Sequence, residues 1–436
     1  MRHSILASAS AAVLLFATST LAAPPDVTSA VTQTASGDIA GVDQTGVTAG
    51  KATASVNQSA DGNKASILQA GAFADDAPNP TTVTVSSTIK QSGAYNTASS
   101  SQTGGSSTST ITQTGTYSTA TYVQNYSQGG APDTSSIQQG GGSSNLAYVH
   151  QFDDGASSAV SQLGSNNSAS VDQSYASTST VTQVGVGQVA VVRQQGGSPT
   201  STITQFGSEG GGNYNQAYVT QVGDSIGSPY SANSSVTQNG SYGVVVVNQP
   251  AYFGKSTVVQ SIGSSNDTAT VFQDSFYSKS DVTQGGQFNT ANVSQSGVDG
   301  NYGDHATIGQ EGSGNQASIG QTGWGDKGTI EQNGNSNGAT SAQSGQFDTS
   351  SIYQSGNGNV AAVTQTGDHD QSKIDQGTGM GATSDQAYVT QGGSNATSNI
   401  TQGGSYNTAV VTQNSALTTV STINQTGVGN FISVKQ

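Results

Sequence analysis

The chain has 436 residues, of which 32% are hydrophobic and 8% are charged, and glycine alone supplies 58. So few long apolar side chains exclude conventional domains with a thick core, which leaves a disordered chain or a thin, repetitive core. The formal net charge of −15 disfavours binding to nucleic acid or anionic membranes, and the absence of cysteine excludes disulfides and thiolate metal sites.

The first 23 residues are typical of a secretory signal peptide. Arg2 gives a positive start, an apolar and alanine-rich run covers residues 5–16, and small residues near Ala22 and Ala23 suit cleavage. A transmembrane anchor is the alternative, but the run is too short to span a bilayer, and no later segment could do so as a helix. We expect a secreted protein with a signal peptide at 1–23, a linker at 24–28 and a repeat domain at 29–436.

The remaining chain is one long repeat. Thirty-four glutamines, from Gln33 to Gln436, each close a short apolar phrase, and 22 of the 33 intervals between them are 11 residues long. The phrases alternate between two kinds, so the period is about 22 residues and occurs 17 times. The longer intervals indicate insertions in turns.

The two kinds of phrase differ at fixed places. The first kind reads Ser-x-Val/Ile-x-Gln, and Val or Ile stands two residues before the glutamine in all 17 copies. The second reads Asn-x-Ala-x-Val-x-Gln, with Ser100, Tyr122 and Ser341 as the exceptions at the Val position. Both patterns have period two, which predicts β-strands with one face inward, and the intervening glycines and asparagines predict turns.

The positions of the charged residues test which face of each strand points inward. Positions zero, two and four before each glutamine should point inward, and none of these 102 positions holds a charged residue. Roughly eight would be expected if no face were buried. The sequence therefore predicts an all-β fold, a cross-β β-solenoid of about 17 two-strand, 22-residue repeats, in which Val and Ile of one sheet meet small residues of the other.

Stacking in register explains the constant glutamine. Each side-chain amide, of Gln or Asn, can donate to its copy in one neighbouring coil and accept from its copy in the other, which satisfies buried amides. We predict a structural stacking ladder at the best-matched units. Its positions are Gln284, Asn289, Ala291, Val293, Gln295, Gln310, Asn315, Ala317, Ile319, Gln321, Gln354, Asn359, Ala361, Val363, Gln365, Gln402, Asn407, Ala409, Val411 and Gln413.

The ends of such a solenoid are sheet edges. Neither a helix nor a polar loop that could cap them is visible in the sequence. We therefore expect end-to-end growth into a cross-β fibre, with other copies of the chain as partners.

These phrases resemble the curlin repeat of curli-type functional amyloids, Ser-x5-Gln-x-Gly-x-x-Asn-x-Ala-x3-Gln. Matches to its second part include "QGGQFNTANVSQ" (Gln284–Gln295), "QEGSGNQASIGQ" (Gln310–Gln321), "QSGNGNVAAVTQ" (Gln354–Gln365) and "QGGSYNTAVVTQ" (Gln402–Gln413). The recurrent serine lies four rather than six residues before the glutamine, and Ser278 is one of few at the family's place. Seventeen units also exceed the handful usual in curlin subunits.

The resemblance implies a function and partners. It implies secretion of an unfolded chain through an outer-membrane channel, and assembly, often started by a nucleator subunit, into extracellular, pilus-like fibres on the cell surface. Such fibres serve biofilm matrix, adhesion and surface colonisation.

Motifs that suggest ligand chemistry have plainer explanations. "GVGQVA" (Gly185–Ala190) imitates a dinucleotide-binding turn, but it recurs in other units and opens strands rather than a helix. Asp368, His369 and Asp370 could hold a metal, yet neighbouring side chains of an extended chain point apart, so a solvated turn is favoured. No Gly-Gly-x-Gly-x-Asp array suggests a calcium-bound solenoid. We expect no enzyme, no cofactor and no metal.

One alternative function stays open. The Thr-x-Thr pairs Thr110/Thr112, Thr180/Thr182 and Thr202/Thr204 could belong to an ice-binding face, although β-branched residues also suit any exposed sheet. His150 and His305 have no partner nearby in the sequence. Our first hypothesis is a polymerising fibre subunit, and the alternative is a monomeric surface-bound solenoid that adheres to a host, glycan or ice surface.

Overall fold

The structure is a computed structural model of the chain. It describes residues 4–7, 12–16, 26–47, 50–70, 83–125, 131–152, 155–207, 213–222, 231–250, 253–297, 302–377, 383–415 and 417–436. The expected cleavage site near Ala22 and Ala23 lies outside these residues.

The described residues form β-strands and turns and contain no helix, so the all-β prediction is confirmed. Accordingly, nothing in this part of the chain could cross a membrane as a helix. The chain divides into two compact units, Met1–Tyr214 with Val222–Pro229, and Asn215–Gln221 with Tyr230–Gln436. In each unit the strands form two parallel sheets, one of odd-numbered and one of even-numbered strands.

The strands of the first unit are as follows. Its odd strands are β1 (Ser4–Ala7), β3 (Asp26–Gln33), β5 (Lys51–Gln58), β7 (Thr84–Gln91), β9 (Ser107–Gln113), β11 (Asp133–Gly140), β13 (Ser157–Ser165), β15 (Thr178–Val186) and β17 (Thr200–Phe206). Its even strands are β2 (Ala12–Phe16), β4 (Ile39–Gly46), β6 (Lys64–Ala70), β8 (Thr97–Thr103), β10 (Thr119–Asn125), β12 (Leu146–Phe152), β14 (Ser168–Ser174) and β16 (Val189–Gln195).

The second unit continues the same alternation. Its even strands are β18 (Gln216–Val222, in this unit up to Gln221), β20 (Val244–Gln249), β22 (Thr268–Gln273), β24 (Thr290–Gln295), β26 (Gln316–Gln321), β28 (Gly338–Gln343), β30 (Val360–Gln365), β32 (Gln386–Gln391), β34 (Thr408–Gln413) and β36 (Phe431–Lys435). Its odd strands are β19 (Asn233–Gln238), β21 (Lys255–Gln260), β23 (Lys279–Gln287), β25 (His305–Ser313), β27 (Lys327–Asn335), β29 (Thr349–Asn357), β31 (Gln371–Gln376), β33 (Thr397–Ser405) and β35 (Val420–Val428).

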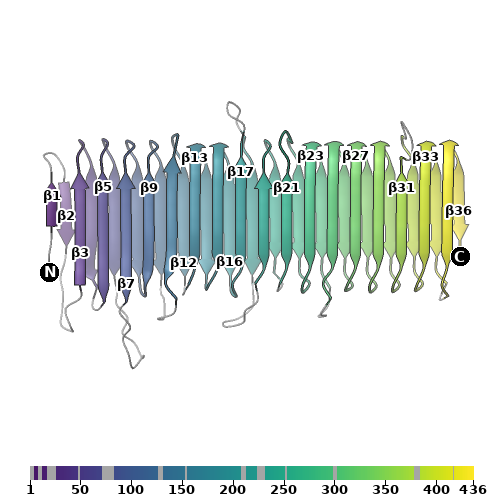
Figure 1. Ribbon diagram of the computed structural model, residues 1–436, viewed down its shortest axis with the longest axis horizontal. Helices are drawn as coiled ribbons and strands as arrows, with labels where there is room; N and C mark the ends of the chain where they lie inside the picture. Colours follow the sequence, from purple (N-terminus) through teal and green to yellow (C-terminus); the bar gives the residue numbers. More distant parts are fainter. Residues whose placement is uncertain are drawn as a thin grey trace, which may run out of the picture. The chain divides into compact units, whose positions relative to one another are not determined.

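Within each unit a strand pairs with the strand two places along the chain, always in parallel. In β29 and β31, for example, Ile352 lies beside Ile374 and Gln354 beside Gln376, so equivalent residues stack. Within either unit, Figure 1 shows one sheet in front and the other, fainter, behind it. Each unit is thus a β-solenoid whose coil is strand, turn, strand, turn, and the chain forms about 17 coils, as the repeat predicts.

The core is thin and follows the period of two. In β30, Ala361, Val363 and Gln365 are buried, whereas Val360 and Thr364 are exposed. Large side chains of one sheet meet small ones of the other: a methyl group on Gly328 in β27 would lie 2.9 Å from Cγ2 of Ile319 in β26. Since each coil has few apolar atoms, burial depends on the coils stacked on either side.

The last residues of odd strands β25 and β27, where the chain begins to turn, require glycine for a steric reason. Gly312 and Gly334 have φ of 104° and 127°, a region that disfavours residues with a side chain. A Cβ on Gly312 would lie 2.0 Å from the carbonyl oxygen of Gly334, and one on Gly334 would lie 1.9 Å from that of Gly356. Adjacent coils therefore approach closely at this point only because the position lacks a side chain.

Two short strands fall within the segment predicted as a signal peptide. β1 pairs with β3, where Ser4 lies beside Ala30, and β2 pairs with β4, where Ala12 lies beside Ile39. The edges of β3 and β4 can therefore accept a further strand each. The signal peptide itself stays a prediction.

Candidate functional site

Within each unit the inward glutamines of successive coils form hydrogen-bonded ladders in both sheets. In the odd sheet of the second unit, Nε2 of Gln310 donates to Oε1 of Gln332 at 2.9 Å, and Gln332 donates in turn to Gln354 at 2.8 Å. In the even sheet, Gln343 donates to Gln365 at 3.0 Å. The donor always lies in the earlier coil, so the ladders have one direction along the chain.

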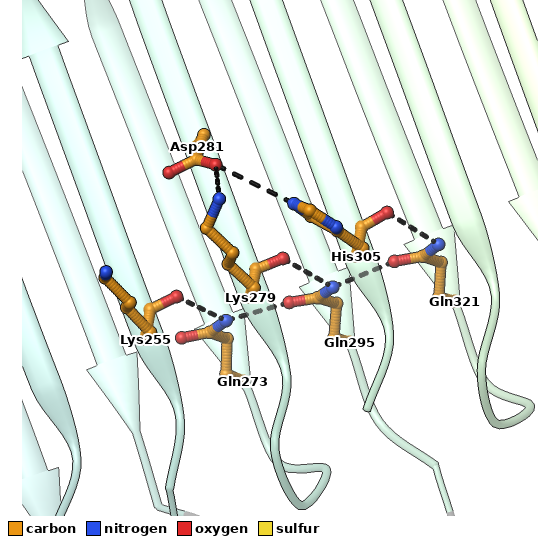
Figure 2. A network of polar contacts seen from close by, with 7 residues as sticks. All are labelled: Lys255, Gln273, Lys279, Asp281, Gln295, His305 and Gln321. Atoms are coloured by element: carbon orange, nitrogen blue, oxygen red, sulfur yellow. Dashed lines mark hydrogen bonds and ion pairs between the residues drawn. The ribbon is translucent and has the colours of Figure 1, made fainter. Parts of the chain in front are cut away.

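Each glutamine also ties its own sheet to the opposite one. Figure 2 shows Gln273, Gln295 and Gln321 of the even sheet, each donating to the next along the row. The same Nε2 atoms of Gln295 and Gln321 donate to the backbone carbonyls of Lys279 and His305 in the odd sheet, at 3.1 and 3.3 Å. Both amide hydrogens are thereby used inside the core, which removes the cost of burying an unpaired donor.

The asparagines bond differently from the expectation. Oδ1 of Asn289 accepts from the backbone N–H of Asn315 at 3.0 Å, rather than from its side chain. The Nδ2 atom of Asn315 donates to the carbonyl of Gly334 in the following coil at 2.8 Å. The side chains of Asn289 and Asn315 therefore connect the turn of one coil to the turn of the next through backbone groups. Asn407 also shows the expected side-chain bond, because its Oδ1 accepts from Nδ2 of Asn430 at 3.0 Å as well as from the backbone N–H of Asn430.

Aspartate replaces asparagine at this turn in three coils. Asp267 and Asp385 still accept the backbone N–H of the next coil, from Asn289 and Asn407, at 2.8 Å each. Their Oδ2 atoms are buried without a hydrogen-bond partner among the described residues. Burial therefore raises the pKa of Asp267 to about 6, against the lowering effect of its hydrogen bonds, and raises the pKa of Asp385 as well.

All twenty residues of the predicted stacking ladder lie inside the second unit. Each is at most 3% exposed. The glutamines occupy the side-chain ladders described above, the asparagines occupy the turns, and the Ala, Val and Ile residues fill the space between the sheets. Together they form the surface by which one coil recognises the next.

One buried tyrosine interrupts a ladder in the first unit. Tyr122 takes an inward place in β10 that is usually held by Val or Ile, and it is fully buried. Its hydroxyl donates to Oε1 of Gln151 at 3.0 Å, while Gln124 in the same strand has no side-chain partner in the described structure. Burial also raises the pKa of Tyr122, so the phenol stays neutral. The sequence marked Tyr122 as an exception but did not indicate that its hydroxyl would take the place of Gln124 as the hydrogen-bond donor to Gln151.

The two other exceptions are satisfied across the core. Ser100 in β8 bonds to Ser109 in β9, with 2.7 Å between the hydroxyl oxygens, and Ser341 in β28 donates to Ser350 in β29 at 2.8 Å. In these two coils a serine of one sheet is therefore satisfied by a serine facing it in the other sheet.

The histidines have partners that sequence proximity did not suggest. Nδ1 of His150 lies 2.9 Å from Asp172 in the next coil. His305 lies 3.7 Å from Asp281, which also pairs with Lys279 on the outer face of the odd sheet (Figure 2). These partners are 22 and 24 residues away, so only the repeat period could have identified them. Such partly exposed pairs contribute little to stability.

The Asp368–Asp370 turn does not bring its side chains together. Asp370 is buried in the turn, whereas His369 is exposed and its ring lies tilted against Phe347, with 5.3 Å between ring centroids. No group of three or more acidic or histidine side chains in the described parts of the chain is arranged to hold a metal.

Aromatic rings also stack along the turns, which the sequence analysis missed. Trp324 stacks on Tyr302 with 5.6 Å between centroids, and Phe347 contacts both rings edge-on, at 5.0 Å from Trp324 and 5.3 Å from Tyr302. Tyr95 and Tyr117 stack at 5.1 Å, and both have φ near 55°, a conformation that is unusual for residues with a side chain. Their spacing by one repeat was the signal available in the sequence.

The coil formed by β35 and β36 is stacked against another coil on one side only among the described residues. Among the described strands, β36 pairs only with β34, and β35 only with β33. Ile432 and Val434 are half-exposed, whereas the equivalent Ala409 and Val411 of β34 are buried. Within the described residues, this edge presents inward side chains and backbone groups of the kind that β33 and β34 cover by stacking.

Comparison with known proteins agrees with the geometry. Residues 87–115 match the family model of the curlin associated repeat. No match was found among curated proteins. The matched segment runs from Ser87 through the turn residue Asn96 and ends beyond Gln113, and its strands β8 and β9 pair in the register of the repeat with β6 and β7. The chain is therefore a curlin-repeat protein.

Proposed function

We propose that the protein is a secreted structural subunit that polymerises end to end into extracellular, curli-like amyloid fibres. The curlin repeat and the β-solenoid fold fit a structural fibre subunit of this kind. In this proposal the fibres serve adhesion, surface colonisation and the biofilm matrix, and a nucleator subunit and an outer-membrane channel act as further partners.

The observation that carries the proposal is the uncovered edge of β35 and β36. Its inward residues Ile432 and Val434 are half-exposed, and it can offer another chain the groups that coils use to stack within the protein. Gln413 donates to Gln436 at 2.9 Å, so the ladder runs up to this edge with its direction unchanged. A head-to-tail copy would continue that direction, whereas a tail-to-tail copy would set donor against donor.

The other junction surface would come from β3 and β4. Both strands accept a further parallel strand, as their pairing with β1 and β2 illustrates. Removal of the signal peptide would free these edges for the β35–β36 edge of another copy. Export would then be coupled to the ability to polymerise.

The test is assembly of the purified mature chain, beginning at residue 24, with two variants in β36. We expect the wild type to form cross-β fibres that bind thioflavin, seen by electron microscopy and accelerated by seeds. Val434→Asp places a charge in the proposed junction and should stop elongation, whereas Ser433→Asp, on the exposed face, should not. Wild-type chain that stays monomeric for days at high concentration contradicts the proposal.

The same experiment addresses the alternative of a monomeric adhesin or ice-binding module. Thr180 and Thr182 of β15 do lie beside Thr202 and Thr204 of β17, but β13 carries Ala159 and Ser161 at these places. The threonine array in this part of the described sheet is therefore narrow. A cell-bound protein that binds a ligand saturably without polymerising would favour the alternative.

A further inference from the structure

Four aspartates stack in consecutive coils at the turns that precede odd strands. Asp304, Asp326, Asp348 and Asp370 each stand six residues before a ladder glutamine, where the curlin motif has serine and where Ser278 stands in the preceding coil. We call these four residues the aspartate column. Every member is at most 1% exposed. Burying four acidic groups one coil apart is costly if they are charged, since they repel each other and lose their hydration.

One carboxyl oxygen of each aspartate is used in a ladder. The backbone N–H of Asp326 donates to Oδ1 of Asp304 at 3.1 Å, that of Asp348 to Asp326 at 3.0 Å, and that of Asp370 to Asp348 at 2.9 Å. The N–H of Ala396 donates to Asp370 at 2.8 Å and ends the column. The geometry copies the asparagine ladder of the opposite turn.

The second carboxyl oxygen is where the two ladders differ. Oδ2 of Asp326, Asp348 and Asp370 is buried and meets no donor in hydrogen-bond geometry among the described residues. The backbone N–H groups of Gly323, Gly345 and Gly367 lower the pKa of the three carboxyls, but less than burial raises it. A methyl group on Gly323 would lie 2.8 Å from Oδ2 of Asp326 and 1.6 Å from the carbonyl oxygen of Gly345, so these two oxygens border the same small space. Gly345 and Gly367 have the same relation to Asp348 and Asp370.

A proton on the carboxyl group would resolve this arrangement. In the opposite turn, Nδ2 of Asn337 donates to the carbonyl of Gly356 at 2.9 Å. An ionised aspartate can only accept hydrogen bonds, so its Oδ2 has no hydrogen to offer the carbonyl oxygen that borders the same space. A protonated carboxyl can donate there, much as the asparagine amide does.

The surrounding charges and the pKa values agree with this geometry. Burial raises the pKa of Asp304 and of Asp348 to about 7 and that of Asp326 to about 6, and it raises the pKa of Asp370 as well. Repulsion within the column adds to the effect for Asp304 and Asp348, while backbone hydrogen bonds oppose it. Asp368 also raises the pKa of Asp326 and Asp370, and His369 lowers that of Asp370.

We propose that the aspartate column is a pH-sensitive element, in which protonation favours stacking of the coils from Asp304 to Ala396 and ionisation loosens them. The inference concerns the stability of these coils and does not require that the protein polymerises. If it does polymerise, assembly will be favoured in mildly acidic surroundings.

The direction of the effect follows from proton binding. Each aspartate has an ordinary pKa of 3.8 when unfolded and a higher pKa when folded, so between these values the folded coils hold more protons. The contribution of the column to the stability of its coils is therefore greatest at or below pH 4. This contribution falls as the pH rises toward 6 to 7 and then levels off. Each carboxyl protonated only in the folded state changes the folding equilibrium constant by about tenfold per pH unit in this window.

The single tryptophan provides the test. Trp324 lies two residues before Asp326, so its fluorescence reports on the column during urea unfolding of the mature chain between pH 4 and 8. For the wild type we expect the midpoint to fall as the pH rises. In the variant Asp326→Asn/Asp348→Asn two neutral amides replace two titrating groups. Each pH unit should therefore lower the folding equilibrium constant about a hundredfold less in this variant than in the wild type.

The matched control is Glu311→Gln/Glu331→Gln, which removes two exposed acids from the same coils. This control should keep the wild-type pH dependence. That result would show that the effect comes from the aspartate column and not from a general change in net charge. The same pH dependence in the wild type and the aspartate variant overturns the proposal. Loss of stability on chelation, in the wild type but not in the aspartate variant, also overturns it, because the column would then bind a cation. Unfolding is measured on monomers, so failure to form fibres leaves this test intact.

Discussion

At the scale of single residues, the inward place four before an odd-strand glutamine accepts Ser, Ala or Gly according to its neighbour. Ser350 is bonded to Ser341, and Gly328 leaves room for Ile319. Ser280 differs, because its buried hydroxyl has no partner in the described structure and the equivalent residue of the next coil is Ala306. The free-energy cost of burying a serine hydroxyl at this place therefore depends on whether a neighbouring residue can form a hydrogen bond with it.

This contrast predicts opposite effects of the same change. Ser280→Ala should leave stability unchanged or raise it by about 1 kcal/mol, because it removes an unpaired buried hydroxyl. Ser350→Ala should lower stability by about 1–2 kcal/mol, because it leaves the hydroxyl of Ser341 unpaired. Urea unfolding of the two variants checks this, and an equal loss in both would contradict the assigned partners.

At the scale of strands and turns, close approach of successive coils depends on the glycine turns. Gly334 has a φ of 127° and faces the carbonyl of Gly356 in the next coil. Gly338 lies only four residues further, in β28, and a methyl group there would meet nothing within 4 Å. The two glycines therefore have different reasons to be there.

We predict that Gly334→Ala destabilises the protein by about 3 kcal/mol or more, through backbone strain and collision with the next coil. Gly338→Ala should change stability by no more than about 0.5 kcal/mol, or raise it slightly, because it restricts the unfolded chain. Thermal or urea unfolding distinguishes the two. Similar losses at both positions would show that the coil spacing is not set by this turn.

At the scale of the whole molecule, each unit is a stack in which a coil contacts only its neighbours. Its stability is then approximately a sum of coil and interface terms, and damage spreads from one coil to the next. Val363 lies between Ser341 of β28 and Val389 of β32, whereas the adjacent Thr364 is exposed.

Val363→Asp should therefore unfold its own coil and weaken the coils on either side, at a cost of about 3 kcal/mol or more, because it buries an unpaired charge. Thr364→Asp should cost no more than about 0.5 kcal/mol. Hydrogen exchange resolved by peptide should show lost protection around β28, β30 and β32 in the first variant only. Equal effects at the two positions would refute the assignment of inward and outward faces.

Much of this architecture could be predicted from the repeat. A period of two, a constant glutamine and 102 uncharged inward positions require β-strands with one buried face, and equal unit lengths require stacking in register. The glutamine ladder follows, because identical side chains one coil apart are natural partners. The predicted β-solenoid and its coil number are confirmed on this basis.

The sequence by itself thus determined which residues share a face and a coil position, since periodicity fixes both. Only the tertiary structure decided what depends on contact between particular coils. Examples are the backbone partners of Asn289, the interruption at Tyr122, and the burial of the aspartate column. The physical reason is that these interactions depend on how closely two backbones approach at a turn and on which groups are left without water, neither of which is encoded in residue spacing.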